Sequence, residues 1–151
     1  MQAKLLRAFW ISSAIILTFT GITKVISAIV PVPILNETDP VLGLTTRWVL
    51  VLVGLLELAV VAVIIIFKQK PFAHLLVAVI GTEFLLYRVV FETAHFSRGC
   101  PCLGRFTAWV HIPDPEINKI LVAVASWLCI GGFTCFFLSS SRKKEYITAG
   151  K

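Results

Sequence analysis

Two cysteines separated by a single residue, Cys100 and Cys102, are the part of this sequence best suited to chemistry. A disulfide between them would close a small ring that departs from relaxed geometry, and such strain makes the bond easier to reduce. Pro101 limits the flexibility of that ring, while Gly99 and Gly104 allow a tight backbone around it. The spacing therefore favours thiol–disulfide exchange over a structural staple.

Positive charge beside the cysteines points the same way. Arg98 and Arg105 flank the pair, and cationic neighbours stabilise the thiolate, which is the reactive form. His95 would also come near the pair if the preceding helix continued, because Arg88, Glu92 and His95 then follow at i, i+4 and i+7. We expect His95 to support the chemistry of the cysteines.

Other interpretations of the cysteines stay open. The pair could form a structural disulfide that pins its loop, or it could remain as two thiols. Cys129 and Cys135 belong to the last apolar run, about 9 Å apart along a helix and on different faces, so we expect them to pack as apolar residues. A metal site is the rival chemistry, although one intervening residue is a poor chelate spacing; its ligands would be His95, Cys100, Cys102 and His111.

The rest of the chain is apolar enough to lie in a membrane. Of its 151 residues, 58% are hydrophobic and 15% are charged, and the mean hydropathy is +0.91. Because a membrane-crossing helix needs about 20 apolar residues, the sequence predicts an all-α membrane protein, a four-helix bundle in one domain over residues 1–151. The predicted spans are residues 8–28, 48–67, 72–91 and 117–139.

The basic residues predict the orientation of these spans. Four crossings put both termini and the short connection after residue 67 on one side, and most lysines and arginines fall there. The positive-inside rule makes that side cytoplasmic, so residues 92–116 would face the periplasm or the cell exterior. We also expect the first span to be uncleaved, because its apolar run is longer than that of a typical signal peptide. The basic residues on the predicted cytoplasmic side are Lys4, Arg7, Lys68, Lys70, Arg142, Lys143, Lys144 and Lys151.

The net charge of +6 could also suggest a nucleic-acid partner. The basic residues, however, occur as short caps at the ends of apolar runs, with no basic stripe interleaved with aromatic residues. We therefore exclude nucleic acid as a partner.

Four ionisable residues interrupt the apolar runs: Lys24, Glu57, Glu83 and Arg88. An ionised side chain in hydrocarbon costs a few kcal/mol unless it is paired or hydrated, and these formal charges cancel. Glycines nearby would let helices approach closely, so we expect an inward-facing polar seam below the cysteine loop. It would stabilise a thiolate or position the head of a quinone; the alternative is that the ions only fix helix register or extend to the interface.

Three segments together carry a resemblance to a known family. They are Gly21-Ile22-Thr23-Lys24, Gly54-Leu55-Leu56-Glu57 and Gly99-Cys100-Pro101-Cys102-Leu103-Gly104. Over essentially its whole length the chain resembles the MauE branch of the MauE/DoxX membrane proteins, although Leu103 stands where members often have phenylalanine and Pro101 where they often have a small residue. The resemblance implies a four-helix protein of the bacterial inner membrane that helps to mature extracytoplasmic proteins.

These observations lead to one main hypothesis and two alternatives. The main hypothesis is a membrane-bound thiol–disulfide oxidoreductase that acts on an extracytoplasmic protein and passes electrons to a quinone or a thioredoxin-like protein. The first alternative is an assembly factor without enzymatic activity, in which the cysteine bridge only shapes the loop. The second, a small-molecule transporter, is suggested by the embedded ions, but four helices are few for that role.

Overall fold

The computed structural model describes residues 2–31, 33–39, 41–67, 70–93 and 114–149. Within these ranges the chain is helical, apart from turns and one isolated bridge between Thr38 and Thr45, and it contains no strand. The elements are α1 (Gln2–Ile29), the short 3-10 helix η1 (Pro33–Asn36), α2 (Thr46–Ile66), α3 (Pro71–Thr93) and α5 (Asp114–Ala149).

Four of these helices are long and apolar enough to cross a membrane, which confirms the prediction of an all-α chain with four such segments. Large apolar side chains lie on the outside of the bundle, with Ile29 73% and Ile130 67% exposed. Lipid tails are as apolar as these side chains, so such exposure is expected of helices in a bilayer. The membrane-length segments are Leu6–Ile29, Thr46–Ile66, Pro71–Val90 and Lys119–Ser140.

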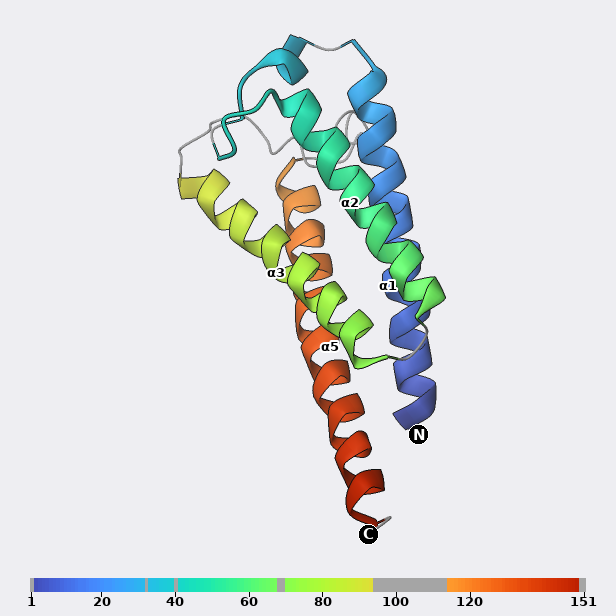
Figure 1. The fold of residues 1–151 in the computed structure, drawn as a ribbon. Helices are drawn as coiled ribbons and strands as arrows, with labels where there is room; N and C mark the ends of the chain where they lie inside the picture. The colour runs from blue at the N-terminus through green and yellow to red at the C-terminus, as the bar shows by residue number, and fades with distance from the viewer. Residues whose placement is uncertain (1, 32, 40, 68–69, 94–113, 150–151) are drawn as a thin grey trace.

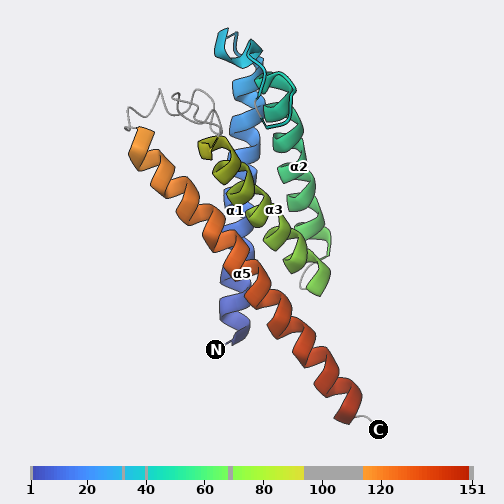
Figure 2. The same ribbon diagram turned by 90° about the vertical axis from the view of Figure 1, so that its left-hand side faces the viewer.

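The helices form two antiparallel pairs. Within the described chain α1 packs mainly against α2, and α3 packs mainly against α5, as Figure 1 shows. Figure 2 shows the same pairing from the side, with the start of α1 and the end of α5 at one end of the bundle. We call this the terminal end, and we call the opposite end, where residues 30–45 connect α1 to α2, the loop end.

The last helix is longer than the predicted span. The apolar run predicted an end near residue 139, whereas α5 continues to Ala149 and extends beyond the other helices in Figure 1. Residues 133–149 contain neither proline nor glycine, and their lysine, arginine and glutamate are good helix formers. Hydrophobicity therefore limits the membrane span, while local propensity continues the helix past it.

The two pairs meet through an apolar core in the terminal half of the bundle. Leu17 from α1, Ile64 from α2 and Leu128 from α5 are almost completely buried there, and Val77 and Ile80 of α3 join the same cluster. A smaller cluster of Ala28, Leu35 and Leu50 closes the α1–α2 pair at the loop end. The apolar contact between the pairs is thus concentrated in the terminal half, which leaves room between them toward the loop end.

Candidate functional site

The structure describes part of the predicted site. Lys24, Glu57, Glu83 and Arg88 all lie on described helices. The remaining predicted residues, His95, Cys100 and Cys102, lie outside the described residues, as does His111 of the metal alternative.

Lys24 on α1 and Glu57 on α2 form a buried ion pair. The Lys24 ammonium donates to Glu57 Oε1, and Thr20 Oγ1 donates to Glu57 Oε2 at 2.7 Å. Glu57 has 0% of its surface exposed and Lys24 has 7%. Thr20 and Lys24 lie one turn apart on the same helix face, so α1 supplies both donors to one carboxylate. Each charge is compensated, which is the condition under which ionised groups persist in an apolar interior.

Glycines bring the two backbones close enough for this pair. A Cβ atom built on Gly54 would lie 2.9 Å from the Gly21 carbonyl oxygen, and one built on Gly21 would lie 3.0 Å from that of Gly54. Each glycine precedes one member of the ion pair by three residues. Small residues at such a crossing let helices approach closely in a membrane. The structure therefore brings together the Gly-x-x-Lys and Gly-x-x-Glu segments that the sequence singled out.

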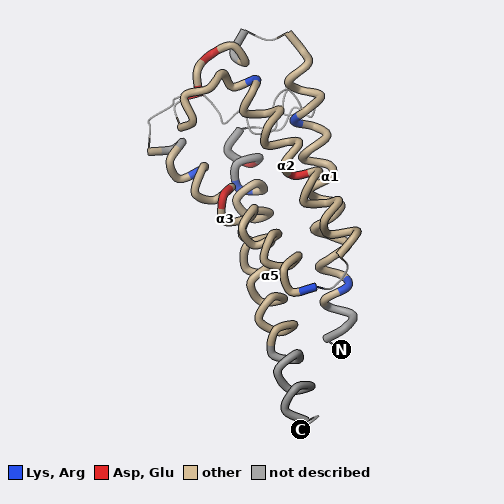
Figure 3. The backbone as a smooth tube through the Cα atoms, in the orientation of Figure 1, with Lys and Arg blue, Asp and Glu red and all other residues tan. Residues whose placement is uncertain are grey.

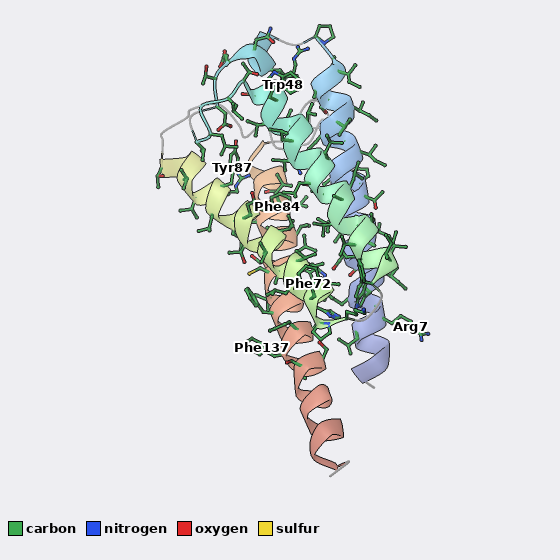
Figure 4. The ribbon with its side chains drawn as sticks, in the orientation of Figure 1. Arg7, Trp48, Phe72, Phe84, Tyr87 and Phe137 are labelled. Atoms are coloured by element: carbon green, nitrogen blue, oxygen red, sulfur yellow. The ribbon has the colours of Figure 1, made fainter. Side chains whose placement is uncertain are left out.

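A cavity of about 600 Å³ lies between the two helix pairs, bounded by all four long helices and by Val41 and Leu42 of the α1–α2 connection. Lys24 borders it, with its ammonium 4.7 Å from the centre of the Phe84 ring on α3. Figure 4 labels Phe84 on α3, and Tyr87 on the same helix nearer the loop end. The cation of the ion pair thus borders a largely apolar space.

The other two embedded charges also border this cavity, from α3. Arg88 is half-buried, whereas the side chain of Glu83 is exposed and forms no ion pair within the described residues. Gly81 and Thr82 face α5, and each further residue turns by about 100° around the helix, so Glu83 points away from that contact. Lys24 and Glu57 therefore pair inside the bundle, whereas Glu83 borders the cavity with an exposed side chain. Figure 3 shows how few charged positions lie along the middle of the described helices.

A hydrogen bond that the sequence did not suggest connects the two pairs at the loop end. Tyr87 of α3 donates to Asp39 Oδ2 at 2.5 Å, and Asp39, in the α1–α2 connection, is 1% exposed. Asp39 Oδ1 also accepts from the backbone amides of Val41 and Leu42, at 2.9 Å each. One carboxylate thus shapes the connection and attaches it to α3. An aspartate before a proline suggests such a turn, but nothing local reveals a partner 48 residues away.

A second contact between the pairs lies nearer the terminal end. Trp10 Nε1 of α1 donates to His74 Nε2 of α3 at 2.7 Å, and His74 Nδ1 lies 3.2 Å from the Lys70 carbonyl oxygen. Because Nε2 accepts, we assign the proton to Nδ1, which makes the ring neutral. Neither residue was among the predicted site residues, because nothing local in the sequence shows that side chains 64 residues apart meet.

The two described cysteines are free. Cys135 is buried in the apolar core, and Cys129 Sγ lies 3.3 Å from Thr82 Oγ1 on α3. Both positions fit the expectation that they pack between helices.

Comparison of the chain with protein-family models, with curated proteins and with solved structures found no match. The resemblance to the MauE/DoxX membrane proteins therefore stays an expectation.

Proposed function

We propose that this chain is a multi-pass protein of the bacterial inner membrane that exchanges thiols and disulfides with an extracytoplasmic protein through Cys100 and Cys102. A thiolate of the partner attacks one sulfur of the Cys100–Cys102 disulfide and forms a mixed disulfide. A second partner thiolate then resolves it, which leaves the partner oxidised and both cysteines as thiols. The partner loses two electrons in this step, and the cysteine pair gains them.

One structural observation supports this proposal most. The cysteine segment lies between α3 and α5 in the sequence. The end of α3 at Thr93 and the start of α5 at Asp114 both lie toward the loop end. The cavity beside Lys24 lies in the same half of the bundle. A segment joined to these two helix ends would therefore start and finish near a membrane-embedded site with a buried cation.

The proposed orientation places the loop end outside the cytoplasm. It rests on the basic residues, most of which belong to the termini and to the short connection between α2 and α3. Disulfides persist in that oxidising compartment, so the same orientation gives the cysteine pair its function.

The electrons must continue to another molecule. Cys129 and Cys135 are both on α5 and free, and Cys135 is buried in the core, so neither is positioned as a surface relay pair. A quinone in the bilayer or a thioredoxin-like protein is the remaining acceptor that we propose.

Thiol trapping in intact cells tests the proposal. A membrane-impermeant maleimide should label Cys100 and Cys102 after mild reduction, and untreated cells should hold part of the pair oxidised. A partner variant that keeps only its attacking cysteine should accumulate as a mixed disulfide with this chain, because the resolving thiolate is missing. The Cys129→Ala variant of this chain should support the same trapping as the parent.

The double Cys100→Ser, Cys102→Ser variant separates exchange from a passive assembly role. Lost maturation of the partner with normal membrane insertion supports exchange. Retained maturation assigns the chain to the assembly factors, and labelling only after the cells are permeabilised contradicts the proposed orientation.

A further inference from the structure

The cavity between the helix pairs has the size and lining of a ligand site. Its volume of about 600 Å³ falls within the range of roughly 300–1,000 Å³ that is common for small-molecule pockets. Aliphatic side chains form most of its wall, among them Val49 and Val53 of α2 and Leu121 and Val124 of α5. A mainly apolar wall with a few polar groups is typical of sites that orient a ligand by its head.

Lys24 offers a charged hydrogen-bond donor to this space. Its ammonium carries three N–H groups, and within the described chain Glu57 is its sole hydrogen-bond partner. Lys24, the donor of the pair, therefore borders the cavity, whereas Glu57, the acceptor, does not. A ligand atom that accepts a hydrogen bond fits beside Lys24.

The charges around the cavity favour an uncharged ligand head. Lys24 is compensated by Glu57, and the two other charged residues at the wall, Glu83 and Arg88, carry opposite signs. An anionic head would add an uncompensated charge to this balanced set, and a cationic head would be repelled by Lys24. A carbonyl oxygen on a neutral ring or ester satisfies the donor without adding charge.

We infer that this cavity binds a long-chain molecule whose uncharged head carries a carbonyl oxygen that accepts a hydrogen bond from Lys24. A phospholipid ester has this chemistry, and so does an isoprenoid quinone. We assign the cavity to the quinone, a choice that rests on the proposed function, because the reduced cysteine pair needs an acceptor. Two thiols give up two electrons and two protons and form one S–S bond, and the quinone takes up both electrons and both protons to become a quinol.

Photoaffinity labelling tests the site. Purified full-length protein in phospholipid nanodiscs is photolysed with an azido derivative of decylubiquinone, and the labelled peptides are identified by mass spectrometry. We expect labels on cavity-lining residues of α1 or α3, displaced by unlabelled decylubiquinone. Labels confined to the outer, lipid-facing side chains would overturn the inference.

Two tryptophan substitutions on neighbouring residues of α2 provide matched variants. Val53 borders the cavity, whereas Leu52 is 54% exposed and does not. Val53→Trp should reduce labelling at least tenfold by filling the space, and Leu52→Trp should leave it unchanged; equal labelling of both overturns the site. If Val53→Trp fails to fold, the double variant Lys24→Met, Glu57→Leu removes the donor without leaving a charge. It should weaken binding roughly tenfold, as expected for the loss of a hydrogen bond from a charged group.

Two further arms separate the ligand from the function. Displacement of the probe by dioleoylphosphatidylethanolamine as effectively as by decylubiquinone would overturn the quinone and assign the cavity to a lipid. The Cys100→Ser, Cys102→Ser variant should bind the probe as the parent does, since neither cysteine is needed for the cavity. If the parent binds the probe normally but has no exchange activity, the proposed function is contradicted and the quinone site is not. If the parent has exchange activity but does not bind the probe, the quinone site is contradicted and the proposed function is not.

Discussion

Both helix pairs cross at glycine contacts, but the polar groups at the two crossings differ. Glycines let the backbones meet in both: Gly21 and Gly54 at the α1–α2 crossing, and Gly81 and Gly132 at the α3–α5 crossing. The second crossing is tighter, because a Cβ on Gly81 would lie 2.5 Å from the Cys129 amide nitrogen. The first crossing holds a buried ion pair, whereas the polar contact found at the second joins Thr82 to Cys129.

This difference shows which part of the bundle is structural. A tight, nearly apolar crossing fixes the angle between two helices and offers little chemistry. A crossing that buries an ammonium and a carboxylate costs desolvation free energy, and packing alone does not require it. We therefore expect substitutions at the α3–α5 crossing to change stability mainly through side-chain volume, and substitutions at the α1–α2 crossing to change it mainly through charge.

The largest effect should come from breaking the ion pair on one side. Glu57→Ala leaves Lys24 buried without its carboxylate and should lower the free energy of unfolding by about 3–5 kcal/mol. The double variant Lys24→Met, Glu57→Leu should unfold close to the parent, because no charge remains to be compensated. Unfolding in mixed detergent micelles measures both, and equal losses in the two variants would show that the pair contributes through shape.

The next largest effect should come from added volume at the tighter crossing. Gly81→Ala places a methyl group against backbone atoms of α5 that cannot move independently, so we expect a loss of up to about 3 kcal/mol. Gly21→Ala meets the Gly54 carbonyl oxygen at 3.0 Å and the movable side chain of Leu58, and it should cost less. Melting temperatures in one detergent compare the two variants, and the reverse order would contradict the stated difference between the crossings.

A smaller effect is expected where the pairs are joined at the loop end. Tyr87→Phe removes the donor to Asp39 Oδ2 and should cost about 1.5 kcal/mol, as for other hydrogen bonds to a charged group. Asp39→Asn keeps an oxygen for the turn and loses the second acceptor. The double variant Tyr87→Phe, Asp39→Asn should therefore be no less stable than the less stable of the two single variants. Additive losses of stability in a double-mutant cycle would show that the two residues act separately.

The smallest effect should come from the polar contact of the second crossing. Thr82→Val keeps the shape of the side chain and removes the hydroxyl near Cys129, at a cost of about 0.6 kcal/mol, typical of polar contacts between membrane helices. Thiol–disulfide exchange should be unchanged. A clear loss of exchange in this variant would place chemistry in the α3–α5 pair as well.

Much of the fold could be predicted from local sequence. Each apolar run is long enough for one helix, and Pro31 and the Asp114-Pro115 pair mark boundaries that the structure places within two residues. The end of α5 was not predicted, because hydropathy reports where lipid ends and not where a helix ends.

The site could be predicted less completely. Lys24 and Glu57 were found as charges beside glycines in apolar runs, yet equally embedded Glu83 proved to be exposed. Asp39 and His74 were missed, because their partners lie 48 and 64 residues away and are brought near by helix packing alone.

The sequence alone determined how many helices form and which residues could take part in chemistry. Helix formation and compatibility with lipid depend on neighbours within a few turns. The tertiary structure decided which helices pair, that Lys24 meets Glu57, and that a cavity remains between the pairs. These features depend on the crossing geometry of backbones at glycine contacts, and no single helix carries the information about its partner's register.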